Sequence, residues 1–444
     1  MAGKKKHAGN NDRDVIVGLD LGTTKTSVII AERGDAEWNV IGVGNSPALG
    51  MKQGVVVNIE HTVDSILQAV EAAERMANVS VESVYAGIAG DHIRSVNSRG
   101  MIAVGRSRNG MGNKISPEDV QRVIETAQTV TFPADRAVLH VISQDFLVDD
   151  REGFKNPVGI VGARLEANVH IITSALAAAQ TILYCLQEAG IRLEELVLQS
   201  LASSLAVLSD DDRELGVALI DLGGGTADIA VFYDGSIRHT AVLGLGGDNV
   251  TRDLAHGLRT PLHIAEQIKL EYGCAHPSRL TQTEPILLSG GGDRPDRQVM
   301  QDILCAVIQP RMEEIFDLAL KELRQADCLH RLTSGVVLTG GGALLTGAVE
   351  VAEEVFNLPV RLMKPQGLGG LKNLANSPIY STGIGLILHG ILLQESWDSR
   401  PTAVYSGSAI WKTKRSRSQR RNGLAARLQG GRFESLRRWI SEVF

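Results

Sequence analysis

The chain has 444 residues, which is long enough for two or more core-forming domains. Its 43% hydrophobic, 22% charged and 4% aromatic residues are an ordinary globular balance with an aliphatic core. Because the stretch Met1–Asp14 is polar and Lys-rich, we expect no signal peptide, and no apolar run reaches the roughly 20 residues of a membrane-spanning helix.

Charge is unevenly distributed along the chain. The net charge is −6, yet residues 411–444 hold ten Lys and Arg against two Glu, which leaves 35 basic and 49 acidic residues elsewhere. An acidic body with a basic tail predicts that the tail meets an anionic partner. The four cysteines form no CxxC pair and no Cys/His metal spacing, so we expect buried, reduced thiols.

The first half of the chain predicts an α/β fold. Gly-punctuated, β-branched segments indicate strands at Val15–Asp20, Ser27–Ala31, Asn39–Val43 and Ser83–Ala89. His61–Asn78 is expected to be a helix because its apolar residues recur on one face. Ser116 is the expected N-cap of another helix, with Pro117 at its first position and Asp119 at its third. Glu166–Ala189 is expected to be a strand followed by a helix.

The second half repeats this alternation. Strands are expected at Val217–Asp221, Ala227–Tyr233, Ser236–Leu243 and Gly335–Thr339, and helices at Asn249–Gly257, Pro261–Tyr272, Asp302–Lys321 and Ala348–Phe356. Asp234–Gly235 indicates a hairpin turn. Ile384–Leu393 is too short to span a membrane and is expected to be a buried core helix. After Glu395 the periodicity fades, which indicates a flexible basic linker over Ser396–Gly431.

An internal repeat is the strongest organisational signal. Asp20-Leu21-Gly22 and Asp221-Leu222-Gly223 each end one expected strand and begin a second, 201 residues apart. The repeat predicts two similar lobes that face a common cleft.

The first of these turns has the chemistry of a phosphate-binding loop. Gly22, Thr23 and Thr24 let backbone N–H groups and hydroxyls approach phosphate oxygens closely. Asp20 would repel phosphate, so we expect a Mg²⁺ ion between them, held through water. Lys25 either approaches phosphate or is solvated on its strand, and the residues alone favour neither interpretation.

The second turn repeats this pattern with Asp221, Gly223, Gly224, Gly225 and Thr226. Two such turns can clamp a polyphosphate from both sides. Neither turn is a Walker loop, since GxxxxGK[ST] is absent, and neither is a Rossmann turn, since a strand rather than a helix follows.

A third glycine turn follows the expected strand Gly335–Thr339. A flat adenine or ribose can lie against Gly340, Gly341 and Gly342, where no side chain obstructs it. A triple glycine alone is more often a tight strand–helix turn. In combination with the two repeated hairpins, it predicts a nucleotide site.

The three motifs resemble the two phosphate motifs and the adenosine motif of the actin/heat-shock/sugar-kinase superfamily. More narrowly, the chain resembles the FtsA family of bacterial cell-division proteins over about residues 14–395 and again in its last thirteen residues. The segments that carry this resemblance are Val84–Gly90, Leu165–Ile171, Leu198–Ser203 and Ala265–Lys269. The resemblance implies an actin-like, two-lobed α/β ATPase fold with duplicated mixed sheets and an inserted small subdomain.

The resemblance also implies a division of the chain. We expect an N-terminal tail to residue 14, a first lobe at 15–82 and 165–195, an inserted subdomain at 83–164, a second lobe at 196–259 and 330–395, its small subdomain at 260–329, a linker at 396–431 and a membrane-targeting amphipathic helix at 432–444.

By the same resemblance, individual residues receive roles in a site for ATP and Mg²⁺. Asp20 and Asp221 flank the magnesium nucleotide, and Glu266 and Lys269 lie on a helix that contacts the nucleoside. Gln199 orients the attacking water, with Asp221 as the second catalytic residue. Many family members carry an acidic residue and a proline near Gln199, which this chain lacks, so we expect at most slow ATP hydrolysis.

The last thirteen residues predict a membrane-bound helix. Its apolar face is formed by Phe433, Leu436, Ile440, Val443 and Phe444, with Trp439 near the border and Arg437 and Arg438 beside or opposite it. Such a helix lies in the interface of an anionic bilayer. Docking on the protein's own body is the alternative, which the long linker disfavours. The basic stretch Lys412–Arg421 also suggests nucleic acid, but no aromatic residues interleave it and the body is acidic, so we expect no nucleic-acid partner.

The resemblance implies a peripheral protein on the cytoplasmic side of the inner or plasma membrane at the septum. Its implied partners are the C-terminal peptide of FtsZ, other copies of itself in filaments through the inserted subdomain, anionic lipids and other division proteins. Arg297 and Arg311 are the candidate contacts for FtsZ. The alternatives are a metabolic kinase of the superfamily, a heat-shock-type chaperone ATPase and a pilus-assembly scaffold.

Overall fold

The structure is a computed structural model and describes residues 14–35, 37–105, 113–280, 285–288, 297–371, 375–398 and 406–407. All of them belong to one unit of the chain. Residues 413–444 form a second unit, which lies outside the described residues.

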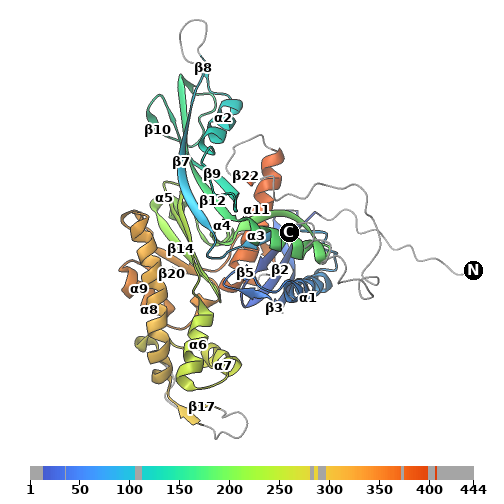
Figure 1. The fold of residues 1–444 in the computed structure, drawn as a ribbon, viewed down its shortest axis with the longest axis vertical. Helices are drawn as coiled ribbons and strands as arrows, with labels where there is room; N and C mark the ends of the chain where they lie inside the picture. The colour runs from blue at the N-terminus through green and yellow to red at the C-terminus, as the bar shows by residue number, and fades with distance from the viewer. Residues whose placement is uncertain are drawn as a thin grey trace, which may run out of the picture. The chain divides into compact units, whose positions relative to one another are not determined.

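A six-stranded mixed sheet forms the centre of the first lobe (Figure 1). Its strands are β1 (Val15–Leu21), β2 (Lys25–Arg33), β3 (Trp38–Pro47), β6 (Ser83–Ile88), β13 (Arg192–Leu198) and β21 (Gly369–Gly370). They lie in the order β13-β6-β1-β2-β3-β21, with β6 and β13 parallel to β1 and with β2 antiparallel to it. Most side chains of β1 and β2 are buried, because helices cover both faces.

The second lobe is built on the same plan. Its strands are β14 (Val217–Leu222), β15 (Ala227–Tyr233), β16 (Ser236–Leu243), β19 (Val336–Thr339) and β20 (Val360–Leu362), in the order β16-β15-β14-β19-β20. This order matches β3-β2-β1-β6-β13 strand for strand, with the same antiparallel and parallel pairings. The predicted duplication of mixed sheets is therefore confirmed.

Helices pack on both sheets and between them. They are α1 (Ile59–Ala77), α3 (Leu176–Glu188), α4 (Gln199–Val207), α5 (Asp210–Leu215), α6 (Gly247–Leu258), α7 (Leu262–Tyr272), α8 (Gln301–Gln325), α9 (Ala348–Phe356) and α11 (Ser381–Asp398). The side chain of Asn58 caps the start of α1, and Asn78 ends it in a left-handed conformation. Figure 1 shows α8 lying along α9, with α6 and α7 nearby. None of the helices in the described chain is long and apolar enough to cross a membrane.

Three aliphatic clusters form the cores of these layers. One surrounds the first sheet with α1, α3 and α11, and a second surrounds the second sheet with α6, α8 and α9. Phe316 is the largest side chain that is fully buried. The low aromatic content is thus matched by cores of Val, Ile, Leu and Ala, as the composition predicts.

The third apolar cluster is the core of an inserted sheet. It contains β7 (Arg94–Ala103), β9 (Arg136–Val148), β10 (Arg151–Phe154) and β12 (Arg164–Ala175), with α2 (Pro117–Ala127) packed on it and the short pair β8 (Asn113–Lys114) and β11 (Val161–Gly162) beside it. The N-cap that the sequence predicts for α2 is present, and it is part of a capping box in which Ser116 and Asp119 exchange hydrogen bonds. A two-residue strand, β22 (Ser406–Gly407), pairs with β9.

Strand pairing and helix packing move three of the expected boundaries. The segment 83–164 was expected to be the insert, but β6 at its start pairs with β1 and β13 in the first sheet. β12, beyond its end, pairs along its length with β7 and β9 and so belongs to the insert. Likewise, β21 joins the first sheet and α11 packs on it, so the last part of 330–395 returns to the first lobe.

The remaining elements are short. They are the hairpin β4 (Met51–Lys52) and β5 (Val55–Val56), the hairpin β17 (Ile286–Leu288) and β18 (Arg297–Val299), and 3₁₀ turns at Pro277–Arg279, Leu329–Arg331, Gly342–Leu344 and Pro378–Tyr380. Asp234 and Gly235 both have positive φ, as the predicted hairpin turn requires. The helix α11 continues to Asp398, slightly past the expected start of the linker.

Candidate functional site

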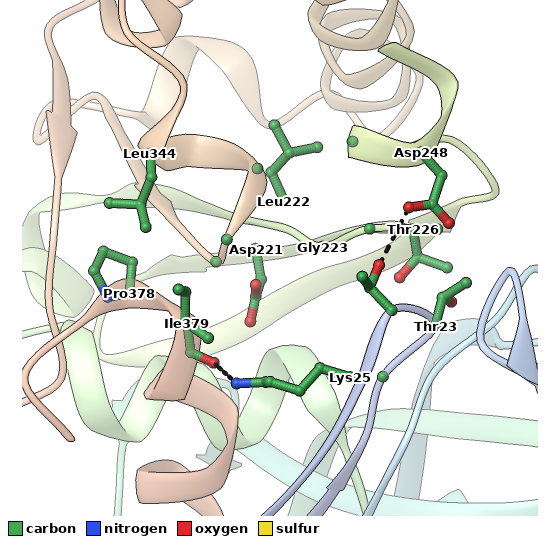
Figure 2. A pocket seen from close by; sticks show the side chains of 18 of the residues that line it. Thr23, Lys25, Asp221, Leu222, Gly223, Thr226, Asp248, Leu344, Pro378 and Ile379 are labelled. Atoms are coloured by element: carbon green, nitrogen blue, oxygen red, sulfur yellow. Dashed lines mark hydrogen bonds between the residues drawn. The ribbon is translucent and has the colours of Figure 1, made fainter. Parts of the chain in front are cut away.

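One cavity of about 490 Å³ lies where the two lobes meet (Figure 2). It gathers the residues that the sequence assigned to the nucleotide and to catalysis: Asp20, Gly22, Thr23, Thr24, Lys25, Gln199, Asp221, Gly223, Gly224, Gly225, Thr226, Glu266, Lys269, Gly340, Gly341 and Gly342. These residues come from five separate parts of the chain, so their convergence is a property of the fold.

The two glycine turns are equivalent down to their hydrogen bonds. In the first turn, the N–H of Gly22 donates to the carbonyl of Lys25 at 3.1 Å. In the second, the N–H of Gly223 donates to the carbonyl of Thr226 at 2.9 Å. The same tight connection therefore joins β1 to β2 and β14 to β15, as the repeat predicts.

The turns also touch each other across the cavity. A Cβ atom added to Gly224 would lie 1.8 Å from the Thr24 hydroxyl, and one added to Gly225 would lie 2.4 Å from the Thr23 hydroxyl. The Thr24 hydroxyl donates to the carboxylate of Asp248 at 3.2 Å, which links the lobes (Figure 2). An added Cβ at Gly223 would make one tight contact, 3.3 Å from the Thr226 carbonyl oxygen, without a direct clash, so Gly224 and Gly225 are the sterically critical residues of this turn.

Three carboxyl groups lie buried at the floor of the cavity. Burial raises the pKa of Asp20 to about 7 and that of Asp228 to about 8, with Asp221 adding repulsion in both cases. The pKa of Asp221 is also raised by burial, although the hydroxyls of Ser203 and Thr382 oppose the change. The cavity thus holds more buried acid than it neutralises, which favours a bound cation.

Lys25 points across the cavity and is half-buried there (Figure 2). Its Nζ donates to the carbonyl of Ile379 at 3.2 Å and lies 4.2 Å from the centroid of the Tyr380 ring. Burial lowers the pKa of Lys25 to about 8, opposed by Asp20 and Asp221. The Lys25 ammonium is thus held at the cavity by Ile379 and Tyr380, and whether it binds phosphate stays a prediction.

Gln199 stands at the start of α4 and is 8% exposed. Its amide nitrogen donates to the carboxylate of Asp20 at 3.1 Å and to the carbonyl of Leu21 at 3.3 Å. These contacts fix the side chain beside the first turn.

The other end of the cavity is more apolar. Leu270, Leu344, Leu345, Pro378 and Ile379 line it. On the adjoining α7, the Lys269 ammonium pairs with Glu266 at 2.7 Å and donates to the carbonyl of Gly247 at 3.2 Å. Polar groups and apolar wall together suit a ring with a sugar attached.

The sequence suggested that the triple glycine leaves room for a nucleotide, but two of its residues are glycine because they pack closely against β14. An added Cβ at Gly340 would lie 2.4 Å from Asp221, and one at Gly342 would lie 2.7 Å from the side chain of Leu222. Both positions therefore need glycine in order to pack against β14. Only Gly341 has open space, with Ile379 nearest at 3.6 Å.

Two acidic residues in the cavity were missed from the sequence. Asp228 pairs with Asp221 across β14 and β15, and its Oδ1 has no hydrogen-bond partner among the described residues. Asp248 lies in the first turn of α6. The repeat contained a signal for Asp228. The equivalent position in the first lobe, Ser27, lies opposite Asp20 and is also polar, although both positions fall on strands with buried, mostly apolar neighbours.

The acidic side chains of the cavity could supply only some of the ligands of a divalent cation directly. Within the described chain, no group of three or more His, Cys, Asp and Glu side chains is arranged to hold a metal. The unpartnered Asp228 oxygen and the surplus of buried acid are compatible with Mg²⁺ held through water and phosphate oxygens.

The remaining assigned residues lie away from this cavity or outside the structure. Arg311 forms two hydrogen bonds to Asp253 on α6, at 2.5 and 3.1 Å, and also pairs with Glu314. Arg297 donates to the carbonyl of Leu258 at 2.6 Å. The membrane-facing set Phe433, Leu436, Arg437, Arg438, Trp439, Ile440, Val443 and Phe444 lies outside the described residues.

Two family models match this sequence. "Cell division protein FtsA" matches residues 218–385, and "SHS2 domain inserted in FTSA" matches residues 90–173. The second match begins after β6 and ends within β12, in agreement with the boundaries given by strand pairing.

Similar proteins include cell division protein FtsA of Pseudomonas aeruginosa, which is 45% identical over 89% of this chain and 93% of its own length. FtsA of Neisseria meningitidis is 41% identical over 96% of this chain and 98% of its own.

Solved structures share the fold at low identity. The PilM-PilN type IV pilus biogenesis complex has a TM-score of 0.60 and 14% identity, covering 85% of this chain and 98% of that one. MreB5 of Spiroplasma citri bound to AMPPNP has a TM-score of 0.54 and 13% identity, covering 86% and 98%. These likenesses establish an actin-like ATPase fold. Together with the sequence relatives, they show that the chain belongs to the FtsA family of actin-like cell-division proteins.

Proposed function

We propose that the chain binds ATP with Mg²⁺ between its two lobes and uses this site to support a filament that anchors FtsZ to the membrane. The observation that carries the nucleotide site is the convergence of two equivalent glycine turns on one cavity of about 490 Å³. That volume lies in the range of small-molecule sites. A related fold, that of MreB5 of Spiroplasma citri, has been solved bound to AMPPNP.

Each part of the nucleotide has a matching part of the cavity. The turns Gly22–Thr24 and Gly223–Thr226 would offer their hydroxyls and the backbone N–H groups that follow the first glycine of each turn to the phosphates, and Lys25 would offer a cation. Asp20, Asp221 and Asp228 would hold Mg²⁺ through water, and the ion would neutralise phosphate charge. The base and ribose would lie between α7 and Gly341.

Hydrolysis is expected to be slow. Gln199, whose amide nitrogen donates to Asp20, would orient the attacking water, with Asp221 as the second catalytic residue. A fast transfer of phosphate to a small metabolite would instead favour a metabolic kinase.

The experiment that tests the site is equilibrium binding of ATP, with and without Mg²⁺, to three full-length variants. Asp221→Ala should remove the magnesium-dependent part of the affinity, and Gly224→Ala should weaken binding because its Cβ displaces Thr24. Asp317→Ala, an exposed aspartate on α8, is the matched control. Equal ATP affinity in the wild type and in both site variants would reject the two-turn clamp.

The membrane and FtsZ roles rest on the family and on the sequence of the tail. The relatives are named for cell division, which supports action at the septum. The amphipathic pattern of residues 432–444 supports peripheral attachment to anionic lipids on the cytoplasmic face. Self-association through the inserted domain, and binding of the FtsZ C-terminal peptide by the small subdomain of the second lobe, complete the proposal.

A further inference from the structure

The hairpin formed by β4 and β5 has its tip at the edge of the nucleotide cavity. Its two turn residues, Gln53 and Gly54, both have positive φ, as a tight two-residue hairpin requires. Gly54 is buried and lines the cavity, whereas Gln53 is half-buried and Lys52, just before the turn, is exposed. No sequence motif drew attention to these residues.

Gly54 makes a direct contact with the first phosphate turn. Its backbone N–H donates to the hydroxyl oxygen of Thr23 at 3.0 Å. A hydroxyl that already accepts one hydrogen bond keeps its own hydrogen free to donate. The hairpin thus fixes the Thr23 oxygen while leaving its O–H available to an anion in the cavity.

Gln53 makes the complementary contact with the second lobe. Its side-chain amide donates to the carbonyl of Gly244 at 2.7 Å, across 191 residues of sequence. Gly244 leads into α6, whose first residues hold the second phosphate turn. The N–H of Gly247 donates to the Gly223 carbonyl at 3.0 Å, and that of Asp248 to the Gly224 carbonyl at 2.7 Å.

The hairpin tip also packs against the entrance to the inserted domain. A Cβ added to Gly54 would lie 2.9 Å from the backbone of Ala89 and Gly90. Those two residues join β6 to the inserted sheet. Neighbouring residues of one small hairpin therefore contact both phosphate turns, one directly and one through α6, and the start of the insert.

We propose that Gln53 and Gly54 form a clasp that sets the spacing of the two phosphate-binding turns and positions Thr23 for a polyphosphate. The proposal rests on the proposed nucleotide site. It assigns Gln53 a positioning role, since its side chain acts on the turns through Gly244 and α6. A ligand that spans both turns should depend on the clasp, and one with a single phosphate should depend on it less.

The first test uses Gln53→Ala, with Lys52→Ala as its matched control on the same hairpin, in the full chain without nucleotide. We expect Gln53→Ala to speed hydrogen exchange of the Gly247 and Asp248 amides several-fold, because the loop before α6 loses its anchor. Lys52→Ala should leave these amides as in the wild type. Equal exchange in both variants would overturn the clasp, whatever the protein binds.

The second test measures binding of ATP and AMP in the presence of Mg²⁺. Loss of one hydrogen bond corresponds to a decrease of about three- to tenfold in ATP affinity for Gln53→Ala, with little change for AMP. Thr23→Val should weaken ATP binding, while Thr23→Ser, which keeps the hydroxyl, should restore most of it. Equal losses for ATP and AMP, or for Thr23→Val and Thr23→Ser, would contradict the positioning role.

The two tests separate the clasp from the nucleotide site. If the wild type binds neither ATP nor AMP, the proposed function fails, and the exchange experiment still decides whether the clasp exists. If the wild type binds ATP and Gln53→Ala binds it equally well, the clasp fails and the nucleotide site stands.

Discussion

His170 is a buried histidine at the junction of the inserted sheet and the second lobe. Its Nδ1–H donates to the Asn97 side-chain oxygen at 2.7 Å, so its Nε2 accepts from the Thr240 hydroxyl at 3.1 Å. Burial lowers the pKa of His170 to about 3, with nearby His239 contributing. The native state therefore holds this ring neutral at pH values well below those at which an exposed histidine gains its proton.

This depressed pKa predicts acid sensitivity. Between about pH 6.5 and pH 3 the unfolded chain binds a proton that the folded His170 does not, so the free energy of unfolding falls as pH falls. The slope contributed by one such group is at most about 1.4 kcal/mol per pH unit. Urea unfolding at several pH values should give a smaller slope for His170→Gln than for the wild type.

The exposed His263 on α7 supplies the control for that measurement. His263→Gln should keep the wild-type slope. An unchanged slope in His170→Gln would mean that this histidine is not the source of the acid sensitivity.

At the residue scale, the sequence predicts roles that depend on neighbouring residues, but it does not predict contacts between residues that only folding brings together. Asp20 and Asp221 could be predicted because each ends a strand in a repeated motif. Gln53 could not, because its partner carbonyl lies 191 residues away and a backbone acceptor leaves no mark on composition. Lys25 could be placed on its strand, but only the fold shows that it points at Ile379 rather than at solvent.

At the scale of elements, the insert is fastened to the edge of the second lobe by side chains. Ser95 and Asn97 on β7 donate to the carbonyls of Thr240 and Arg238, and Gln144 on β9 donates to the carbonyl of Ile237. These side chains cover the outer edge of β16, which would otherwise expose a row of unpaired carbonyls.

Asn97→Ala should destabilise the protein by about 1–3 kcal/mol. The change removes one exposed donor to the Arg238 carbonyl and one acceptor that His170 and Gln144 share in part-buried contacts. Chemical unfolding measures the loss, and hydrogen exchange should rise along β16. Lys114→Ala, exposed on the same insert, should change neither. A decrease in the free energy of unfolding below about 0.5 kcal/mol would mean that water replaces the hydrogen bonds of Asn97 without a loss of stability.

Both candidate arginines of the proposed FtsZ site form hydrogen bonds to the helix α6. Arg311 bonds Asp253 and Arg297 bonds the Leu258 carbonyl, both on this helix. Because Arg311 is held by two carboxylates, Arg297 is the better candidate for a partner's carboxylate. Leu262, Met300 and Ile303 on neighbouring elements are exposed and would offer apolar contacts to such a peptide.

Arg297→Glu should therefore weaken binding of an FtsZ C-terminal peptide about tenfold or more, measured by fluorescence anisotropy at low salt. Arg324→Glu makes the same charge change at an exposed position on α8 and is the control. Binding that is equal in the two variants would remove Arg297 from the proposed site.

Element types and ends were largely predictable, but sheet membership was not. The signals for α2 are local: Ser116 as cap, Pro117 at the first position and Asp119 at the third. Whether Ser83–Ile88 joins the first sheet or the insert depends on which strands lie beside it. A buried strand has the same apolar pattern in either sheet, so the boundary at residue 83 was misplaced.

At the scale of the whole molecule, the proposed membrane attachment belongs to the tail. Removing residues 432–444 should abolish pelleting with vesicles that contain anionic lipid, because the apolar face and its basic residues are lost together. Trp439→Glu or Ile440→Glu should act similarly. Arg437→Glu with Arg438→Glu should weaken binding mainly at low salt, where the surface potential is least screened.

One short helix gives only modest affinity, so stable attachment should need many tails on one filament. A variant that cannot polymerise should pellet less than the wild type despite an intact tail. Equally tight binding by that monomer would reject avidity, and unchanged binding after removal of 432–444 would reject the membrane proposal itself.

The inserted domain has a consequence for the history of the fold. Its first strand begins at Arg94 and its last strand reaches Thr173, and these two residues are paired partners in the ladder of β7 and β12. The ends of the insert therefore lie side by side, and its apolar cluster is its own. A segment with adjoining ends and a separate core can enter or leave a host gene without breaking the host's sheet. Such a domain can be inserted as one unit, so a single insertion into the gene of an actin-like ancestor is enough to account for it.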